Sequence, residues 1–358
     1  MAGGPSTWEL AAAVSAAGGV GFLAGGMASP EQLVQDVGAA RQAAPEAVIG
    51  VNLFVPEPAN TAVPAERRSP DSPSRRRRAE QVRSFRSSLL TEAEAAGVVL
   101  PEVEELDPDA PDGWEAKLDA AEAGAWPLVT FTFGLPGPEV FARLHAAGSV
   151  LGVTVTRPEE AVAALGHGAD LLIVQGPESG GHRSVHDPAA DPGTTGLVTL
   201  LARVRDAVGQ DVPLVAAGGL MSAAEVSAVL ASGAMAAQCG TAFLRADEAG
   251  TAPLHRTALE ACTSGTGFTS TALTRAFSGR WARSLVNGFL TAHPDAPAAY
   301  PELNVLTGPL KKAAAAQGDP HGVSLWAGTG AARAQTGPAS RILQSLAPKH
   351  GRHTVSLP

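Results

Sequence analysis

The segment Val174-Gln-Gly-Pro-Glu-Ser-Gly-Gly-His-Arg183 places one imidazole in a loop of flexible backbone. It follows the short apolar run 170–174, which has the pattern of a buried parallel strand. His182 is therefore expected at the C-terminal end of a strand, where ligands and catalytic groups collect in α/β folds. Gly180 and Gly181 carry no Cβ, so the main chain there can approach a flat or phosphorylated ligand closely. A solvated histidine after an ordinary glycine turn is the alternative interpretation.

Two further glycine-rich strand ends follow, Leu214-Val-Ala-Ala-Gly-Gly-Leu220 and Ala236-Ala-Gln-Cys-Gly-Thr-Ala-Phe243. In (β/α)8 barrels the loops after the last two strands often bind phosphate through backbone N–H groups and a helix N-terminus. Gly218 and Gly219 would allow close approach on one side. Gly240 and Thr241 would supply an N–H group and a hydroxyl on the other. This pattern favours a phosphorylated ligand, although plain barrel ends also use glycine for tight turns.

The elements that must position these loops alternate between short apolar runs and alanine-rich segments of helical period, which is typical of βα units and a parallel sheet. Strands are predicted at 19–23, 48–54, 128–133, 150–156, 171–175, 214–217 and 237–243. Helices are predicted at 8–17, 30–44, 138–147, 158–166, 195–208 and 223–232.

These seven strands are one fewer than a closed TIM (β/α)8 barrel contains. The segment 8–17 has the pattern of the first barrel helix, and Ala2-Gly-Gly-Pro-Ser-Thr7 that of the loop leading into it. We therefore predict a TIM barrel whose first strand is missing or truncated at the N-terminus. Another segment that fills the gap, or a barrel open at that point, is the alternative.

Two segments depart from the repeat. Residues 56–81 are rich in Pro, Ser and Arg and include the consecutive Arg75–Arg78, so we expect a mobile, solvated loop, with contact to a phosphate or a partner as the alternative. A helical pattern follows over 79–96. The tail after Phe243 contains alanine-rich helices and the turn Trp326-Ala-Gly-Thr-Gly330. We predict a ligand-binding barrel domain over 1–250, and the final barrel helix with a C-terminal helical extension that could fold back over the site in 251–358.

The bulk composition excludes several classes of protein. A net charge of −9 argues against nucleic acid or an anionic membrane as a general partner. No segment approaches the about 18 consecutive apolar residues of a membrane span. The first residues lack the basic and apolar regions of a signal peptide, so a cytoplasmic location is expected. Cys239 and Cys262 are too few for a disulfide framework, and their spacing suits no metal site.

Six motifs in this order resemble those of the nitronate monooxygenases, formerly grouped as 2-nitropropane dioxygenases. They are Ala2-Gly-Gly-Pro-Ser-Thr7, Gly50-Val-Asn-Leu-Phe54, Thr130-Phe-Thr-Phe-Gly-Leu-Pro136, the His182 loop, Ala216-Ala-Gly-Gly219 and Gln238-Cys-Gly-Thr-Ala-Phe243. The tail segments Tyr300-Pro-Glu-Leu-Asn304 and Leu325-Trp-Ala-Gly328 are similar to the class I branch.

The resemblance implies an FMN-dependent barrel that oxidises alkyl nitronates such as propionate 3-nitronate with O₂ to a carbonyl compound and nitrite. Asn52 and Gln175 carry amides at strand ends that can pair with the polar edge of the flavin ring, and the downstream glycines suit its phosphate. The FMN-contacting residues that the resemblance implies are Ala2, Gly3, Gly4, Asn52, Gln175, Gly180, Gly181, Gly218, Gly219, Gln238, Cys239, Gly240 and Thr241.

His182 is the catalytic residue that the resemblance implies. A neutral imidazole could take the α-proton of a neutral nitroalkane. A nitronate is already an anion, so with that substrate His182 would instead hold the nitro oxygens. Arg183 could add positive charge or pair with a carboxylate such as Glu178.

Two departures from the class I pattern concern the substrate. Tyr300 is the only tyrosine, whereas the class I pocket that accepts carboxylated nitronates has several. Lys311 and Lys312 could bind a carboxylate, but surface lysines on a helix are the default interpretation. For the oligomeric state, the sequence is compatible with a monomer and with a homodimer.

Two other functions compete with nitronate oxidation. One is an NAD(P)H-dependent flavin reductase of the same fold, of the enoyl-acyl-carrier-protein or quinone reductase type. No G-x-G-x-x-G segment in a βαβ setting is present, although such reductases do not need one. The other is a non-catalytic barrel that binds a phosphorylated ligand.

Overall fold

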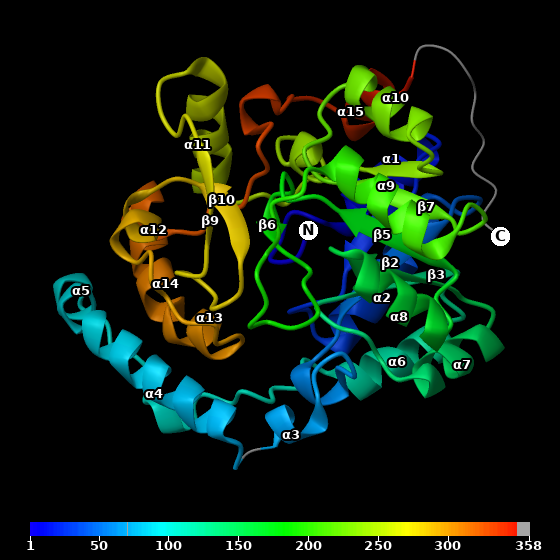
Figure 1. Ribbon diagram of the computed structural model, residues 1–358. Helices are drawn as coiled ribbons and strands as arrows, with labels where there is room; N and C mark the ends of the chain where they lie inside the picture. The colour runs from blue at the N-terminus through cyan, green and yellow to red at the C-terminus, as the bar shows by residue number, and fades with distance from the viewer. Residues whose placement is uncertain (70, 349–358) are drawn as a thin grey trace.

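Seven short strands form one parallel sheet that curls through the barrel half of the molecule (Figure 1). The structure is a computed structural model and describes residues 1–69 and 71–348. The strands, in spatial order, are β1 (Gly21–Ala24), β2 (Ile49–Phe54), β3 (Leu128–Thr132), β4 (Val150–Val155), β5 (Leu171–Gln175), β7 (Leu214–Ala217) and β8 (Ala236–Gln238). The prediction of seven barrel strands is confirmed, except that the last strand ends at Gln238 and a 3₁₀ turn, η3 (Thr241–Phe243), replaces its expected second half.

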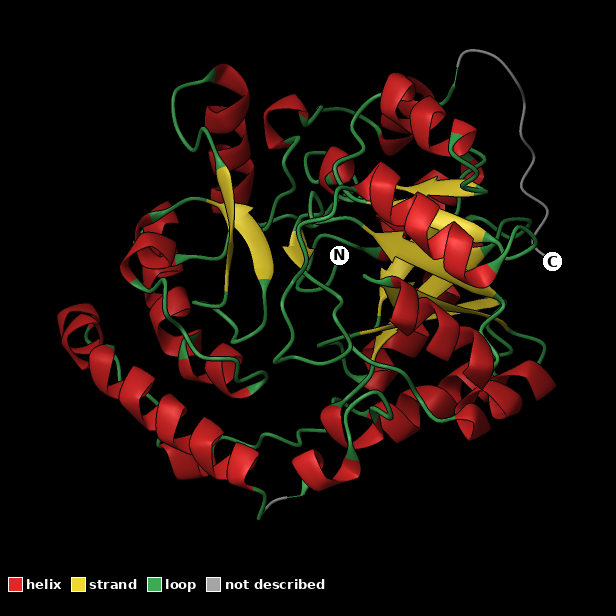
Figure 2. Ribbon diagram, in the orientation of Figure 1, coloured by secondary structure: helices red, strands yellow, loops and turns green. Residues whose placement is uncertain are grey.

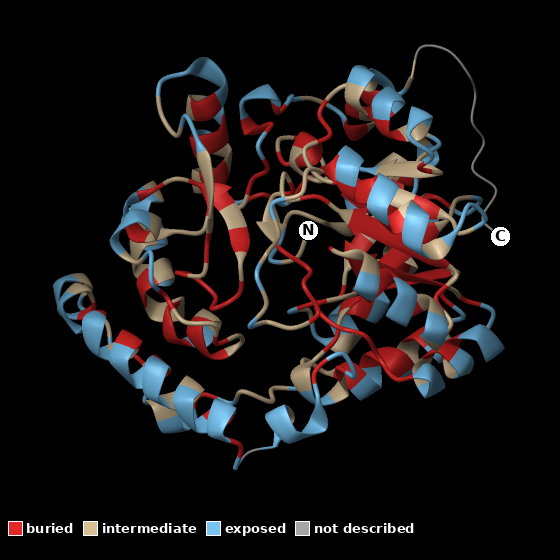
Figure 3. Ribbon diagram, in the orientation of Figure 1, coloured by how far each residue is buried: buried red, intermediate tan, exposed pale blue. Residues whose placement is uncertain are grey.

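Helices cover the outer face of this sheet because they alternate with the strands along the chain and bury one apolar side against it (Figure 2). The barrel helices before the last strand are α1 (Trp8–Ala16), α2 (Pro30–Ala43), α6 (Trp114–Ala123), α7 (Pro138–Ala146), α8 (Pro158–His167), α9 (Leu197–Val208) and α10 (Ala223–Ala231). Thr7, Ser29 and Ser222 cap α1, α2 and α10 with side-chain oxygens. The largest core cluster lies between these helices and the strands, where buried residues concentrate (Figure 3).

Among the described residues the sheet does not close by strand pairing. β1 pairs only with β2, and β8 pairs only with β7. The segment 1–7 forms turns that pack beside the chain after β8: Thr7 Oγ1 donates to the Glu248 carbonyl, and the Gly250 N–H donates to the Pro5 carbonyl. Met1 approaches Gly240.

The final helix on the barrel is α15 (Ala339–Leu346), which packs between α1 and α10. Ile342 and Leu346 on α15 share a core cluster with Leu10 and Val226. The chain therefore inserts its extension before the final barrel helix, whereas the sequence suggested the opposite order. This extension contains α11 (Pro253–Ser264), β9 (Thr271–Thr274), β10 (Ala282–Leu285), α12 (Gly288–Ala292), α13 (Glu302–Leu306) and α14 (Gly308–Ala316), followed by the 3₁₀ turns η4 (Pro320–Gly322) and η5 (Ala331–Arg333).

The expectation of a loop over 56–81 is wrong for much of that segment. It contains η1 (Glu57–Ala59), α3 (Ala65–Arg68) and the start of α4 (Pro73–Ser88), which α5 (Leu90–Ala96) and η2 (Val103–Glu105) follow. Ser72 caps α4 and Pro73 occupies its first turn, so local chemistry favours a helix at that point. Arg76 and Arg77 are exposed as expected, but Arg75 is buried in ion pairs.

Residues 73–106 and 271–326 together form a side lobe, seen at the left and lower left of Figure 1. Its own apolar core joins the two segments, with Val82, Phe85 and Leu89 from α4 and its end packed near Phe277 and Leu303. Glu57, just before this lobe, forms ion pairs with Arg75 and Arg78. Arg78 also forms an ion pair with Glu302 on α13. None of the described helices is long and apolar enough to cross a membrane.

Candidate active site

His182 lies on a short strand, β6 (Gly181–His182), that joins the barrel to the side lobe. β6 pairs antiparallel with β10, and His182 stands opposite Ala282. The loop before it docks against the 326–330 turn, because a Cβ on Gly180 would lie 2.4 Å from the Gly328 nitrogen. Gly181 has φ +72°, a conformation that favours glycine. The two adjacent glycines thus serve a close backbone contact and a left-handed turn.

Gln175 and Arg183 fix the shape of this loop. Gln175 Nε2 donates to the His182 carbonyl at 3.0 Å, and its Oε1 accepts from Arg183 Nη1 at 2.8 Å and from the Ser184 N–H at 2.9 Å. The buried Arg183 also donates to the Gly176 carbonyl at 2.7 Å and to the Pro192 carbonyl. Arg183 therefore hydrogen-bonds to backbone carbonyls and does not pair with Glu178. Its guanidinium stabilises the conformation of the loop.

The imidazole of His182 is surrounded by three aromatic rings and one hydroxyl. Its ring centroid lies 5.5 Å from that of Phe133, 6.0 Å from that of Tyr300 and 5.2 Å from that of Trp326. Ser278 Oγ lies 2.8 Å from His182 Nε2. The other contacts of the hydroxyl, to the Arg280 backbone, are both 3.4 Å long, so donation to Nε2 is favoured and the ring proton is assigned to Nδ1.

This environment keeps the imidazole neutral. Desolvation by the surrounding groups and the positive charges of Arg280 and Lys311 lower the pKa of His182 to about 3. Lys311 is half-buried, with Nζ donating to Asn304 Oδ1 at 3.0 Å, and desolvation lowers its own pKa to about 8. Lys311 is therefore not the solvated surface lysine expected from the sequence, whereas Lys312 is exposed.

Phe133 is held in a strained conformation at the end of β3, with φ +80°. The guanidinium carbon of Arg280 lies 4.3 Å from the centroid of its ring, and Arg280 Nη2 donates to the Phe133 carbonyl at 2.8 Å. Arg280 thus contacts both the ring and the backbone carbonyl of Phe133. These contacts explain how a non-glycine residue keeps a positive φ. The planes of the Phe133 and His182 rings meet at 75°, in an edge-to-face arrangement.

The glycine-rich ends of β7 and β8 meet the 326–330 turn. Gly218 has φ +120°, and a Cβ there would lie 2.4 Å from Ser179 Oγ. Thr241 Oγ1 accepts from the Gly328 N–H at 3.0 Å. Within residues 1–69 and 71–348, the N–H groups of Gly218, Gly219, Gly240 and Thr241 donate to no protein acceptor. Four free backbone donors at neighbouring strand ends suit an anionic phosphate.

The other residues expected to contact a flavin lie along the same barrel end. Asn52 donates from Nδ2 to the hydroxyls of Thr130 and Thr132, both at 2.9 Å. Gln238 is exposed at the end of β8, while Ala2, Gly3 and Gly4 lie in the first turns, beside Gly250. Burial raises the pKa of the Cys239 thiol to about 12, so this side chain stays protonated. Among the described residues no cluster of three or more His, Cys, Asp or Glu could hold a metal ion.

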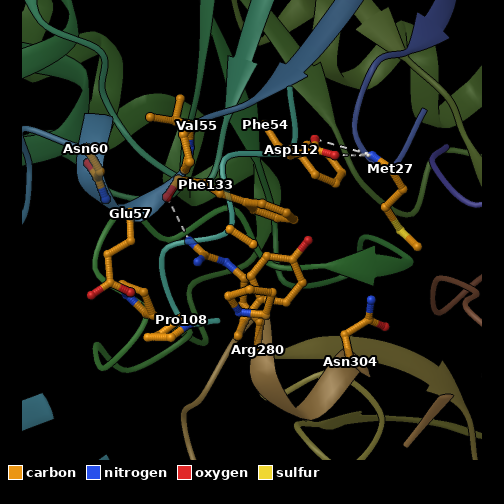
Figure 4. Close-up of a pocket in the computed structure, with 15 residues that line it drawn as sticks. Met27, Phe54, Val55, Glu57, Asn60, Pro108, Asp112, Phe133, Arg280 and Asn304 are labelled. Atoms are coloured by element: carbon orange, nitrogen blue, oxygen red, sulfur yellow. Dashed lines mark hydrogen bonds between the residues drawn. The ribbon is translucent and has the colours of Figure 1, made fainter. Parts of the chain in front are cut away.

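A cavity of about 170 Å³ opens beside this cluster (Figure 4). Phe133, Arg280 and Tyr300 form the wall next to His182, and Met27, Phe54 and Asn304 lie on other sides. Most of the remaining lining is apolar. The cavity therefore gives a small organic molecule a path to the aromatic surroundings of His182.

The sequence interpretation assigned no role to Ser278 or Arg280. Both lie in the chain after β9, about a hundred residues from the His182 loop, and no local motif links them to it. Phe133 belonged to a motif that supported the resemblance, and Trp326 to the glycine-rich turn, but neither received a role. A signal for Arg280 existed: an arginine between aromatic and small residues in Phe277-Ser-Gly-Arg-Trp281 is unusual for a solvated surface.

Comparisons with known proteins agree on one family. A family profile described as nitronate monooxygenase matches residues 1–349. A probable nitronate monooxygenase of Staphylococcus aureus strain Newman is 31% identical over 348 residues, covering 96% of this chain and 90% of that protein. The crystal structure of a nitroalkane oxidase from Streptomyces ansochromogenes is 44% identical with a TM-score of 0.85, covering 97% of this chain and 92% of that one. FabK from Thermotoga maritima, at 23% identity and a TM-score of 0.68, shares the fold.

Proposed function

The chain belongs to the nitronate monooxygenase family, whose members are flavin-dependent oxidoreductases, and from that premise we propose that it oxidises alkyl nitronates with O₂ by means of FMN. Oxidation of nitro compounds is common to the family and to the nitroalkane oxidase that this chain resembles. The proposed products are a carbonyl compound and nitrite: two nitronates and one O₂ balance to two carbonyl compounds and two nitrites. Propionate 3-nitronate and simple alkyl nitronates are the proposed substrates.

One observation carries this proposal: a neutral imidazole lies among aromatic rings, within the field of two cations, beside a set of free backbone donors. FMN fits these residues. The N–H groups of Gly218, Gly219, Gly240 and Thr241 would hold its phosphate, and Asn52 Oδ1, which accepts no hydrogen bond among the described residues, would face its ring. When bound, FMN would supply the electron transfer between nitronate and O₂.

Residues of the chain would prepare the substrate for that transfer. Phe133, Tyr300 and Trp326 exclude water from the surroundings of His182 and give the substrate carbon an apolar contact. Arg280 and Lys311 favour an anion at this place. With a nitronate, His182 would donate its Nδ1 proton to a nitro oxygen and so orient the substrate.

A neutral nitroalkane requires one further step. This step uses the other tautomer: with its ring proton on Nε2 and donated to Ser278 Oγ, His182 would accept the α-proton at Nδ1, and the C–H electron pair would move into the nitro group to give the nitronate. His182 is a weak base alone, because its pKa is lowered to about 3. The nitronate formed beside it would offset the charges of Arg280 and Lys311 and so make the imidazolium less unfavourable. The nitronate is therefore the better substrate.

The test begins with the purified protein. Its flavin is released and identified by mass, and O₂ consumption and nitrite are measured with propyl-2-nitronate and propionate 3-nitronate. The proposal expects FMN, and nitrite formation that stops without O₂. A parallel anaerobic mixture with NADH separates the reductase alternative: loss of flavin absorbance with NADH, and no nitrite from either nitronate, would overturn the proposal.

A further inference from the structure

Arg280 is a buried cation without a carboxylate partner. Its residue is 3% exposed, and among the described residues it forms no salt bridge. Nη2 donates to the carbonyls of Phe133 and Val185. Nε has no acceptor, and Nη1 donates to none within the described chain. Since a buried charge without a counter-ion is costly, an arginine kept in this state indicates that an anion completes its environment.

The other charged side chains that line the cavity are already neutralised. Glu57 accepts from Arg78 at 2.7 Å and lies 3.3 Å from Arg75. Asp112 pairs with Lys117 at 2.9 Å and also accepts from the Met27 N–H. Arg280 is therefore the charged lining residue, among those described, that lacks an opposite charge. The described lining of the cavity therefore has one uncompensated positive charge and no uncompensated carboxylate, which favours the binding of an anion.

Arg280 is also next to the reacting groups. Its guanidinium carbon and the His182 ring lie 4.3 Å and 5.5 Å, respectively, from the centroid of the same Phe133 ring. Ser278, two residues earlier, contacts His182 Nε2. A planar nitronate beside Phe133 could therefore present one oxygen to Arg280 and the other to His182.

We propose that the cavity bounded by Phe133, Tyr300 and Arg280 is the binding site of the substrate's nitronate group, and that Arg280 is the counter-ion of its oxygens. This inference rests on the proposed function for the identity of the anion. In this inference the cation of the side lobe, Arg280, binds the nitronate group itself and not a carboxylate elsewhere on the substrate. Arginine suits this task because it stays charged when desolvated and donates in the plane of its guanidinium.

Nitrate, a planar anion with the shape of a nitro group, is the direct probe. Calorimetry should detect nitrate binding to the flavin-loaded protein, and Arg280→Gln should weaken it about 100-fold. The matched control is Arg275→Gln, because Arg275 also stacks on an aromatic ring, 4.2 Å from the centroid of Trp281, but does not line the cavity. Its nitrate affinity should match that of the wild type. Unchanged binding in Arg280→Gln would overturn the inference.

Turnover supplies the second readout. Arg280→Gln should lower kcat/KM for propyl-2-nitronate, whose only charge is the nitronate, about 100-fold. The loss for freshly dissolved neutral 2-nitropropane at saturation should be smaller. Equal losses for both substrates, or a loss confined to propionate 3-nitronate, would overturn the assignment. If the wild type oxidises no nitronate at all, the proposed function fails, but nitrate binding still reports on Arg280.

A second pair of variants avoids the hydrogen bonds that Arg280 makes to Phe133 and Val185. Ala110 lines the same cavity, so Ala110→Glu adds a carboxylate to its wall and Ala110→Gln adds the same bulk without charge. Ala110→Glu should weaken nitrate binding about tenfold more than Ala110→Gln does. Identical affinities in the two variants would contradict a free cation in the cavity, even if Arg280→Gln failed to fold.

Discussion

The barrel end and the side lobe meet at His182 but offer a ligand different chemistry. The barrel end contributes mainly backbone: the free N–H groups at Gly218, Gly219, Gly240 and Thr241. The side lobe contributes side chains, with Ser278, Arg280 and Lys311 supplying a hydroxyl and two cations. A backbone cradle binds a phosphate of fixed shape, whereas side chains set the charge and the protonation state around the substrate. The difference suggests that cofactor binding and substrate chemistry can be perturbed separately.

The two regions also differ in how they are held together. The barrel core joins strands and helices that follow one another in the chain. The side lobe joins 73–106 to 271–326, and the ion pair between Arg78 and Glu302 reinforces the contact. Substitutions in the lobe should therefore affect its docking as well as the chemistry at His182.

Removing the His182 side chain should give the largest effect. It tests directly whether cofactor binding and substrate chemistry can be perturbed separately. His182→Ala should retain flavin at the wild-type level, since the cradle is backbone of other loops. Its kcat/KM for neutral nitroethane should fall about 10²- to 10⁴-fold, the usual contribution of a general base. The loss for ethyl nitronate should be smaller, because that substrate needs no deprotonation. His321→Ala, an exposed histidine of the lobe, is the control. Equal retention of both activities would exclude His182 as the base.

Breaking the buried ion pairs of the side lobe should give the second-largest effect, on the stability of the protein. Glu57→Gln removes the carboxylate shared by Arg75 and Arg78, whose side chains are only 7% and 12% exposed, and should lower the free energy of unfolding by about 3 kcal/mol. Glu104→Gln breaks an exposed pair with Arg83 on the same helix and should cost less than about 1 kcal/mol. Urea unfolding measures both, and limited proteolysis within 82–106 reports whether the lobe opens. Equal stability of the two variants would show that the buried pairs do not hold the lobe.

The contrast between the regions also explains what the sequence could predict. The barrel strands and their glycine-rich ends were found because period and turn chemistry are local properties. The β6 pairing with β10, and the approach of Ser278 and Arg280 to His182, join segments about a hundred residues apart. The residues around Arg280 signal burial, but a single sequence contains no local signal for which distant residues it contacts.

The arginine run shows the same limit inside one helix. Composition favoured a solvated loop, and for Arg76 and Arg77 exposure was correct. Arg75 and Arg78 are one helical turn apart and face Glu57, which the sequence interpretation did not connect with them. Similarly, α15 was not expected to be the final barrel helix, because its apolar side matches α1 and α10 only in the folded structure.

The smallest expected effect comes from the hydroxyl that positions the imidazole. Ser278→Ala removes the hydrogen-bond partner of His182 Nε2 and should lower kcat for neutral nitroethane about three- to tenfold, with little change in KM, because one neutral hydrogen bond contributes about 1 kcal/mol. Ser278→Thr keeps the hydroxyl and should restore most of the rate. Failure of threonine to restore it would assign Ser278 to packing alone.

The pH profile of the same variant tests whether the side lobe controls protonation. With its pKa lowered to about 3, His182 is neutral at all higher pH, so kcat/KM for freshly dissolved nitroethane should be flat from about pH 5 to 7. Ser278→Ala leaves the desolvation and the charges of Arg280 and Lys311 in place, so its profile should stay flat at a lower level. A limb near pH 6.5 in either protein would mean that His182 titrates as a solvated histidine. The lobe would then shape the site without setting its charge.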